Sequence, residues 1–365
     1  MFRRDLLAGA AAGAAAAALP RFAIAQPAAA RTLKYVPHAN IPNIDPFTNT
    51  AFIARDHAFL VYDQLYGMND KFEPVPQMVQ GHVVENDGLL WRFTLRDGLK
   101  FHDGAPVRGR DCIASIKRWG RRDAFGQELL ARTADMTEDS DRVFTIKLSR
   151  PFPKMLEAFS KVTTSCLFIM PERLANVDPF TNISEAVGSG PFRFVQNEWV
   201  PGSSLAYERN PDYVPVPNGT PSMTAGPKIV HIDRVEWKII PDASTAAAAL
   251  QNGEIDWWEQ PTADLFPLVA RNRNVTVDVI NGTGLIGIFR PNHLTKPFDN
   301  PAVRRAVITA INQMDFMTAV IGEATVPGYA TLRRDNIGFF APESPSASTV
   351  GLDRYKKSID AARAE

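Results

Sequence analysis

The sequence predicts a mixed fold of the α/β or α+β class rather than a β-sandwich. Short stretches that alternate apolar and polar residues, as half-buried strands do, are separated by stretches with the 3.6-residue apolar period of a helix. The chain has 365 residues, of which 45% are hydrophobic and 22% charged. At about 150 residues per domain, this length allows two or three domains with their own cores. The 28 prolines and 23 glycines indicate many loops rather than a helical bundle.

The first half of the chain is expected to alternate strands and helices. Residues 32–36 predict an edge strand that Pro37 closes, followed by a loop over 38–50 and an apolar helix over about 59–66. Residues 91–96 alternate as a strand, and the turn at Asp97-Gly98 predicts a hairpin with residues 99–101. Asp111 is expected to cap a helix that Gly120 ends, and residues 144–148 predict another strand.

The second half continues this pattern. A strand over 235–240 is followed by an alanine-rich helix that starts at Pro241-Asp242 and ends at Asn252-Gly253. Residues 275–280 predict a strand, and Asn300-Pro301 starts the clearest helix of the chain. Asp315 is expected to cap its continuation, which Gly322 ends. Residues 352–362 carry an amphipathic stripe that predicts a final helix without a stop signal, so we expect the chain to be truncated.

Charge and cysteine content exclude several classes of protein. Forty basic and forty acidic residues leave no positive excess for nucleic-acid phosphates, so no nucleic-acid partner is expected. Cys112 and Cys166 are the only cysteines, which excludes a disulfide scaffold and a cysteine zinc site. A single disulfide and two buried thiols both remain open, and two thiols are favoured.

Residues 1–25 predict an export signal. Arg3 and Arg4 precede an uncharged run over 6–19, which is shorter than the roughly 20 residues that span a bilayer. Small residues at 23 and 25 predict cleavage before Gln26. The arginine pair resembles a twin-arginine signal, and the general secretory route is the alternative. We therefore expect a periplasmic protein that is not embedded in the membrane.

Known catalytic and cofactor motifs are missing or incomplete. The six histidines show no HExxH spacing, so no metal site is expected, and His102 fits a turn residue bonded to backbone. Gly282–Gly287 matches GxGxxG, but Pro291 and Pro297 exclude the helix that a dinucleotide needs, so no cofactor is expected. Glu254 and Asp256 are expected on a solvated strand face beside Trp257-Trp258, with Glu259 in the same acidic cluster. Whether these tryptophans line a pocket or a core stays open.

Several motifs in a fixed order resemble the family 5 extracellular solute-binding proteins, the oligopeptide, dipeptide and nickel receptors of ABC importers. Residues 90–104, LWRFTLRDGLKFHDG, are similar to the signature of that family, and further matches span most of residues 32–320. These further matches are Asp45-Pro46, residues 61–65, 188–192, 208–213, 250–256 and 297–306.

The resemblance implies a two-lobed periplasmic binding protein of type II with an inserted extra domain (cluster C type), whose C-terminal part is missing here. Domain I would comprise residues 26–75 and 185–285, domain II residues 76–184, and residues 286–365 would be the first part of domain III. A monomer would close its lobes around a peptide-type solute and deliver it to the permease subunits of an importer. No chemical step is implied, and the protein is expected not to be an enzyme.

The resemblance also implies ligand-binding positions, each with a structural alternative. They are Phe47, Thr48 and Asn49 in the first pocket loop, Phe125 and Ser165 in domain II, and Arg290 and Asn292 near the hinge. Phe47 and Phe125 could equally be core residues, Asn49 a turn residue, and Arg290 a surface ion pair.

Three alternatives stay open from the sequence. The ligand could be a nickel complex, an opine or a sugar instead of a peptide. An exported enzyme on the same scaffold would need a nucleophile and base in the cleft, and no such pair is evident. A chain of 365 residues that lacks part of domain III is expected to aggregate and to bind nothing tightly.

Overall fold

The computed structural model describes residues 31–284, 286–322 and 334–364. Thr32–Glu365 forms one compact unit. The export signal predicted for residues 1–25 lies outside the described residues. No helix within the described part of the chain is both long enough and apolar enough to cross a membrane.

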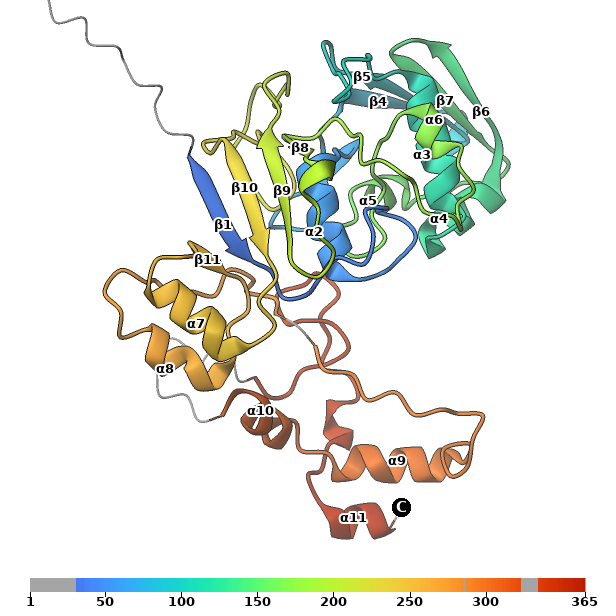
Figure 1. The fold of residues 1–365 in the computed structure, drawn as a ribbon. Helices are drawn as coiled ribbons and strands as arrows, with labels where there is room; N and C mark the ends of the chain where they lie inside the picture. The colour runs from blue at the N-terminus through green and yellow to red at the C-terminus, as the bar shows by residue number, and fades with distance from the viewer. Residues whose placement is uncertain (1–30, 285, 323–333, 365) are drawn as a thin grey trace, which may run out of the picture. The chain divides into compact units, whose positions relative to one another are not determined.

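A five-stranded mixed sheet is built from both ends of the first 260 residues (Figure 1). Its strand order is β11-β1-β10-β9-β8, and β1 runs parallel to both β10 and β11. The strands are β1 (Thr32–Val36), β8 (Phe192–Phe194), β9 (Ser204–Arg209), β10 (Arg234–Lys238) and β11 (Trp257–Trp258). The prediction that β1 is an edge strand is wrong, because β11 pairs with its last two residues. That partner lies more than 200 residues away, beyond the reach of a local pattern.

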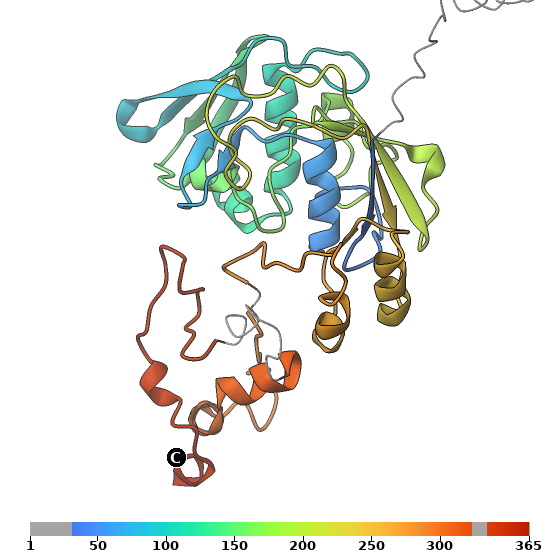
Figure 2. The same cartoon turned by 90° about the vertical axis from the view of Figure 1, so that its left-hand side faces the viewer.

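Helix α2 (Phe52–Val61) lies beside this sheet (Figure 2). His57 packs edge-on against Phe194 of β8 and contacts Tyr207 of β9. The helix ends at Val61, so the prediction of a helix through residue 66 is wrong beyond that point. Gly188 and Gly190 close the end of the helix, where a Cβ atom on Gly188 would meet the carbonyl oxygen of Val61 at 2.1 Å. The glycines are required because the chain passes directly over this carbonyl.

A four-stranded antiparallel sheet with the order β4-β5-β7-β6 forms the second layered part. The strands are β4 (Val79–Glu85), β5 (Leu90–Leu95), β6 (Thr133–Ser140) and β7 (Val143–Leu148). The strands predicted at 91–96 and 144–148 are confirmed. The predicted hairpin, in which residues 91–96 would pair with 99–101, is wrong. Residues 99–101 fold back on 105–107 instead, where the Val107 amide donates to the Leu99 carbonyl. The pairing partners of β5 are β4 and β7.

Helix α3 (Gly109–Gly120) packs against β6 and β7. It ends at Gly120, as predicted, but begins two residues before Asp111. The Asp111 carboxylate occupies the third helical position and accepts from the Arg108 amide, so it caps the helix from inside the first turn. Cys112 and Cys166 are both buried free thiols, which confirms the favoured interpretation.

The other described helices and strands before residue 285 have three to nine residues. They comprise β2 (Tyr66–Met68), β3 (Pro74–Pro76), α4 (Ala124–Arg132), α5 (Met155–Phe159), α6 (Glu172–Ala175), α7 (Ala243–Gln251) and α8 (Phe266–Val269). The alanine-rich helix is confirmed as α7, with the Asp242 carboxylate accepting from the Thr245 amide. No strand forms over 275–280, where the described residues provide no pairing partner.

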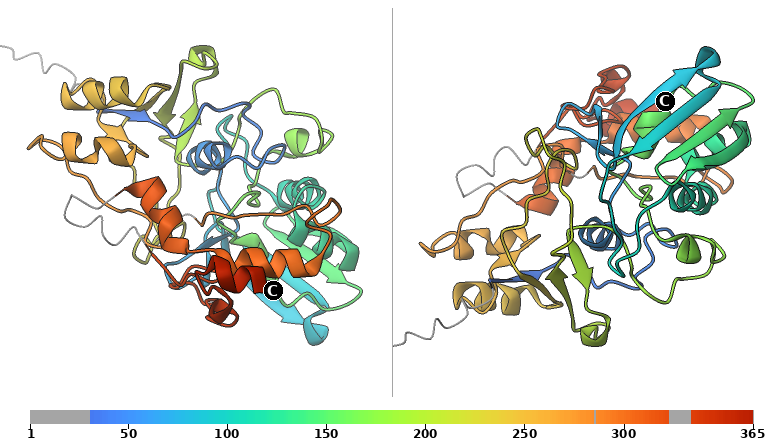
Figure 3. Two further views of the ribbon diagram at one scale, coloured as in Figure 1. Left: turned by 90° about the horizontal axis from the view of Figure 1, so that it is seen from below. Right: turned by 90° about the horizontal axis from the view of Figure 1, so that it is seen from above.

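The described residues among 286–364 contain three α-helices, α9 (Pro301–Ala310), α10 (Gln313–Ile321) and α11 (Ile359–Ala364). Helices α9 and α11 lie side by side (Figure 3). Asn300 caps α9, as predicted. Asn312, not Asp315, caps α10, and Gly322 ends it. The final helix predicted over 352–362 is broken, because Lys357 adopts a φ of 56° between a short turn and α11.

Candidate ligand site at the carboxyl ends of β1 and β11

The strands β1, β10 and β11 are parallel, so their carboxyl ends lie at the same edge of the five-stranded sheet. β11 reaches the far side of β1 after crossing from β10 through α7, so β1 has a parallel neighbour on each side. In open α/β sheets, ligands bind beyond the carboxyl ends of strands at such a switch of strand order. His38 follows β1 at this edge, and Glu259 follows β11.

The Glu259 carboxylate joins the two strand ends. Its Oε2 atom accepts from the Tyr35 hydroxyl at 2.5 Å and from the His38 amide at 2.9 Å. The Nδ1 atom of His38 lies 2.9 Å from the same oxygen. The side chains of His38 and Glu259 are 19% and 20% exposed, so the pair is reachable but well screened from water.

Asp56 enters the same cluster from α2. The Nε and Nη2 atoms of Arg55 donate to Asp56 Oδ1 at 3.1 and 2.9 Å, and the guanidinium lies over the Phe52 ring at 4.6 Å. One ligand atom each of His38, Asp56 and Glu259 lie within 4.8 Å of one another. We call these three residues the edge cluster.

Burial and hydrogen bonding shift the acid–base properties of the edge cluster. The hydrogen bond to Glu259 raises the pKa of His38 above its usual value, against the effect of burial. Burial acts to raise the pKa of Glu259, but the hydrogen bonds from His38 and Tyr35 outweigh it, so this pKa is lowered. Burial raises the pKa of Asp56 although Arg55 opposes the change. The cluster therefore contains a hydrogen-bonded His38–Glu259 pair, which is an ion pair when His38 is protonated, and a poorly solvated second carboxyl group.

Aromatic side chains beside the edge cluster provide apolar surface. Trp257 is 40% exposed and packs edge-on against Tyr35 with ring centroids 5.0 Å apart. Phe52 is also 40% exposed. Ligand sites typically combine apolar and aromatic walls with a few fixed polar groups, which is the composition found here.

The first three positions implied by the resemblance lie in the loop that begins at His38. Phe47 is fully enclosed, as in its core alternative. The Thr48 hydroxyl donates to Asn182 Oδ1 at 2.6 Å, and the side-chain Nδ2 of Asn49 donates to Asn43 Oδ1 at 3.2 Å. Asn49 Oδ1 accepts from the Ala51 amide, the turn role that the sequence left open. These bonds fix the loop, while contact of its side chains with a ligand stays a prediction.

The other four implied positions lie in other segments. Phe125 is exposed on α4, and Ser165 is buried with its carbonyl accepting from Trp119 Nε1. Arg290 and Asn292 are both exposed, and Asn292 Oδ1 accepts from the Leu294 amide. Their role as ligand contacts likewise stays a prediction.

Local sequence patterns indicated only one residue of the edge cluster, Glu259. Glu254 and Asp256 are exposed, as expected, but they lie before β11 and not on a strand face, so the strand prediction is wrong for them. Glu259 is half-buried, and its Oε2 atom takes part in three hydrogen bonds. His38 and Asp56 were missed as site residues. The acidic run around Trp257-Trp258 was the available signal. His102 bonds to the Gly190 carbonyl, as expected of a turn residue, and no helix begins among the described residues from Gly282 to Asn300.

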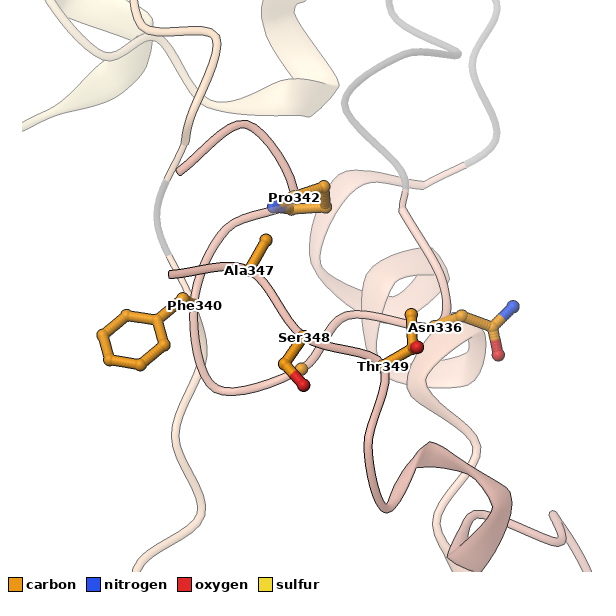
Figure 4. A pocket seen from close by; sticks show the side chains of 7 residues that line it. Asn336, Phe340, Pro342, Ala347, Ser348 and Thr349 are labelled. Carbon is orange, nitrogen blue, oxygen red and sulfur yellow. The ribbon is translucent and has the colours of Figure 1, made fainter. Parts of the chain in front are cut away.

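A hollow of about 460 Å³ lies in a different part of the chain (Figure 4). Its lining consists of Asn336, Gly338, Phe340, Pro342, Ala347, Ser348 and Thr349. None of these side chains is charged, so the hollow offers no anchor for an ionic solute. The edge cluster is therefore the stronger candidate site.

Comparisons with known proteins agree with the fold. The family model described as "Bacterial extracellular solute-binding proteins, family 5 Middle" matches residues 73–365. The probable peptide ABC transporter periplasmic-binding protein y4tO of Sinorhizobium fredii (strain NBRC 101917 / NGR234) is 36% identical over 359 residues, covering 93% of this chain and 66% of y4tO.

Two solved structures share the fold at low identity. DppA from Helicobacter pylori in complex with the peptide STSA gives a TM-score of 0.72 at 21% identity, covering 91% of this chain and 65% of DppA. AppA from Bacillus subtilis in complex with a nonapeptide gives a TM-score of 0.67 at 20% identity, covering 91% of this chain and 62% of AppA. The chain thus spans about two thirds of the length of each of these proteins.

Proposed function

The chain belongs to the bacterial extracellular solute-binding proteins of family 5, and we propose that it is the substrate-binding component of an ABC importer for a peptide-type solute. The observation that carries the proposal is the 36% identity to the probable peptide-binding y4tO along 93% of this chain. The peptide complexes of DppA and AppA on the same fold agree with it. The protein releases its solute unchanged, so no catalytic residue is proposed.

The edge cluster gives the proposal a physical site. A peptide carries an ammonium group, a carboxylate and a row of amides, and the cluster offers carboxylates, a histidine and Arg55 within one partly screened region. Extended peptides are held mainly through backbone hydrogen bonds, which tolerate varied side chains. Trp257 and Phe52 supply the apolar contacts. Ligand contact at Phe47, Thr48, Asn49, Phe125, Ser165, Arg290 and Asn292 is part of the proposal.

Closure of lobes around the ligand is the proposed transport step. The proposed domains are residues 26–75 with 185–285, residues 76–184, and residues 286–365. The five-stranded sheet takes its strands only from the first domain, and the four-stranded sheet only from the second, which supports these boundaries. A monomer exported by residues 1–25 presents the closed form to the permease subunits outside the inner membrane.

Thermal unfolding with and without peptides tests the proposal. The purified protein is melted with pools of dipeptides to nonapeptides. A ligand that binds only the native state at 100 times its Kd stabilises the protein by about 2.7 kcal/mol. A pool that raises Tm supports the proposal. If no peptide pool raises Tm but an opine or a sugar does, the protein is a receptor for a non-peptide solute.

A further inference from the structure

The edge cluster brings together three side chains of the types that ligate metals. His38 comes from the loop after β1, Asp56 from α2, and Glu259 from the segment after β11. One ligand atom of each lies within 4.8 Å of the others. Zinc bonds to nitrogen and oxygen ligands measure about 2.0–2.2 Å, so small side-chain rotations would allow all three to reach one ion.

Neighbouring groups hold the two carboxylates while leaving one oxygen of each available. The described hydrogen bonds to Glu259 all reach Oε2, and those to Asp56 all reach Oδ1. Among the described residues, none donates to Glu259 Oε1 or to Asp56 Oδ2. Hydrogen bonds to the second oxygen orient a ligating carboxylate, and this is the outer shell that metal sites require.

We propose that His38, Asp56 and Glu259 bind a divalent transition-metal ion of the Zn²⁺ or Ni²⁺ class. An imidazole ligand favours these ions over Mg²⁺ and Ca²⁺, which prefer sites built from oxygen alone. Three protein ligands leave at least one coordination position open for water or for a donor atom of a solute. The proton shared by His38 and Glu259 leaves when the ion binds. The inference does not depend on the peptide proposal, since the ion is tested without any solute.

Sequence spacing could not show this site. The expectation of no metal site rested on the lack of paired histidines along the chain. The ligands here stand at positions 38, 56 and 259, and only the pairing of β1 with β11 brings His38 to Glu259.

Calorimetric titration of the metal-stripped protein with ZnCl₂ and, separately, NiCl₂ tests the proposal. Wild type is expected to bind one ion, and Glu259→Gln and His38→Ala are each expected to weaken binding at least tenfold. Even loss of an outer-shell partner costs about 10–100-fold in metal affinity. Glu254→Gln and His293→Ala are the matched controls, because they remove an exposed carboxylate and an exposed histidine outside the cluster.

Each outcome of these titrations either supports or overturns the metal site. Loss of binding in the cluster variants with retention in the controls supports the site. No binding by wild type, or equal binding by all variants, overturns it. Asp56→Asn replaces either cluster variant that fails to fold, as judged by its circular dichroism spectrum. Peptide binding without metal binding refutes this inference alone, and metal binding without peptide binding refutes the proposed cargo alone.

Discussion

Glu259 is the residue on which the candidate site depends, because it follows β11 and its carboxylate bonds to Tyr35 and His38 at the end of β1. The charge on His38 stabilises this arrangement. Since the folded pKa of His38 is raised, its contribution to stability is complete below about pH 6.5, the unfolded value, and is lost as pH rises through the folded pKa.

Glu259→Gln should therefore lower the pKa of His38 toward its unperturbed value. The substitution should also destabilise the protein more at pH 6 than at pH 9. NMR titration of the His38 ring and urea unfolding at the two pH values measure these effects. A His38 pKa that is the same in both proteins would show that Glu259 does not hold its charge.

Arg118 and Asp45 form an ion pair with side chains that are 0% exposed. The guanidinium also donates to the carbonyls of Asp178 and Thr181, and the Asp45 carboxylate accepts from the Ile183 amide. The pair thereby ties α3 to the loop of Phe47 and Thr48. Removal of one partner from such a buried pair leaves an uncompensated charge.

Arg118→Met should accordingly cost about 3–5 kcal/mol of unfolding free energy. Lys154→Met is the control, because the Lys154–Glu157 pair is exposed and such pairs contribute about 0–1 kcal/mol. Urea unfolding of both variants measures the difference. Similar losses in the two variants would contradict the structural role of the buried pair.

At the scale of elements, sequence patterns predicted what local interactions determine. Helices α7 and α9 were found because Asp242 and Asn300 cap them within two or three residues. The position of β1 in its sheet and the partners of β5 were wrong, because both depend on strands distant in sequence. Glu259 was missed as a site residue for the same reason: its partners Tyr35 and His38 are more than 200 residues away.

The contact between α2 and the 188–190 segment gives a prediction at this scale. Gly188→Ala should destabilise the protein by about 1–3 kcal/mol, because its Cβ would lie 2.1 Å from the Val61 carbonyl oxygen. Gly81→Ala is the control, since nothing lies within 4 Å of a Cβ at that position. Thermal unfolding compares the two. An unchanged Tm for Gly188→Ala would mean that the segment does not pack against the helix end.

At the scale of the whole molecule, two buried histidines contribute to the loss of stability in acid. Burial lowers the pKa of His57 to about 3 and that of His102 to about 4, so both are neutral in the folded protein. The unfolded chain protonates them below about pH 6.5, which favours unfolding. Their stabilisation is present above that value and is lost as pH falls.

Between about pH 6 and pH 4.5, each of these histidines should contribute a slope approaching 1.4 kcal/mol per pH unit. Urea unfolding over this range measures the total. His102→Gln should reduce the slope by about half of the joint contribution. An unchanged slope in that variant would show that His102 is not the buried neutral group described here.

The membership in the solute-binding family followed from ordered motifs in the sequence, whereas the ligand site needed the sheet. We propose that a peptide binds at the carboxyl ends of β1 and β11. Its most direct test is calorimetric titration of a peptide hit into wild type, Glu259→Gln and Glu254→Gln. We predict binding by wild type and Glu254→Gln, and at least about tenfold weaker binding by Glu259→Gln, equal to 1.4 kcal/mol. Equal affinity in all three proteins, or no peptide binding by wild type, would contradict the account.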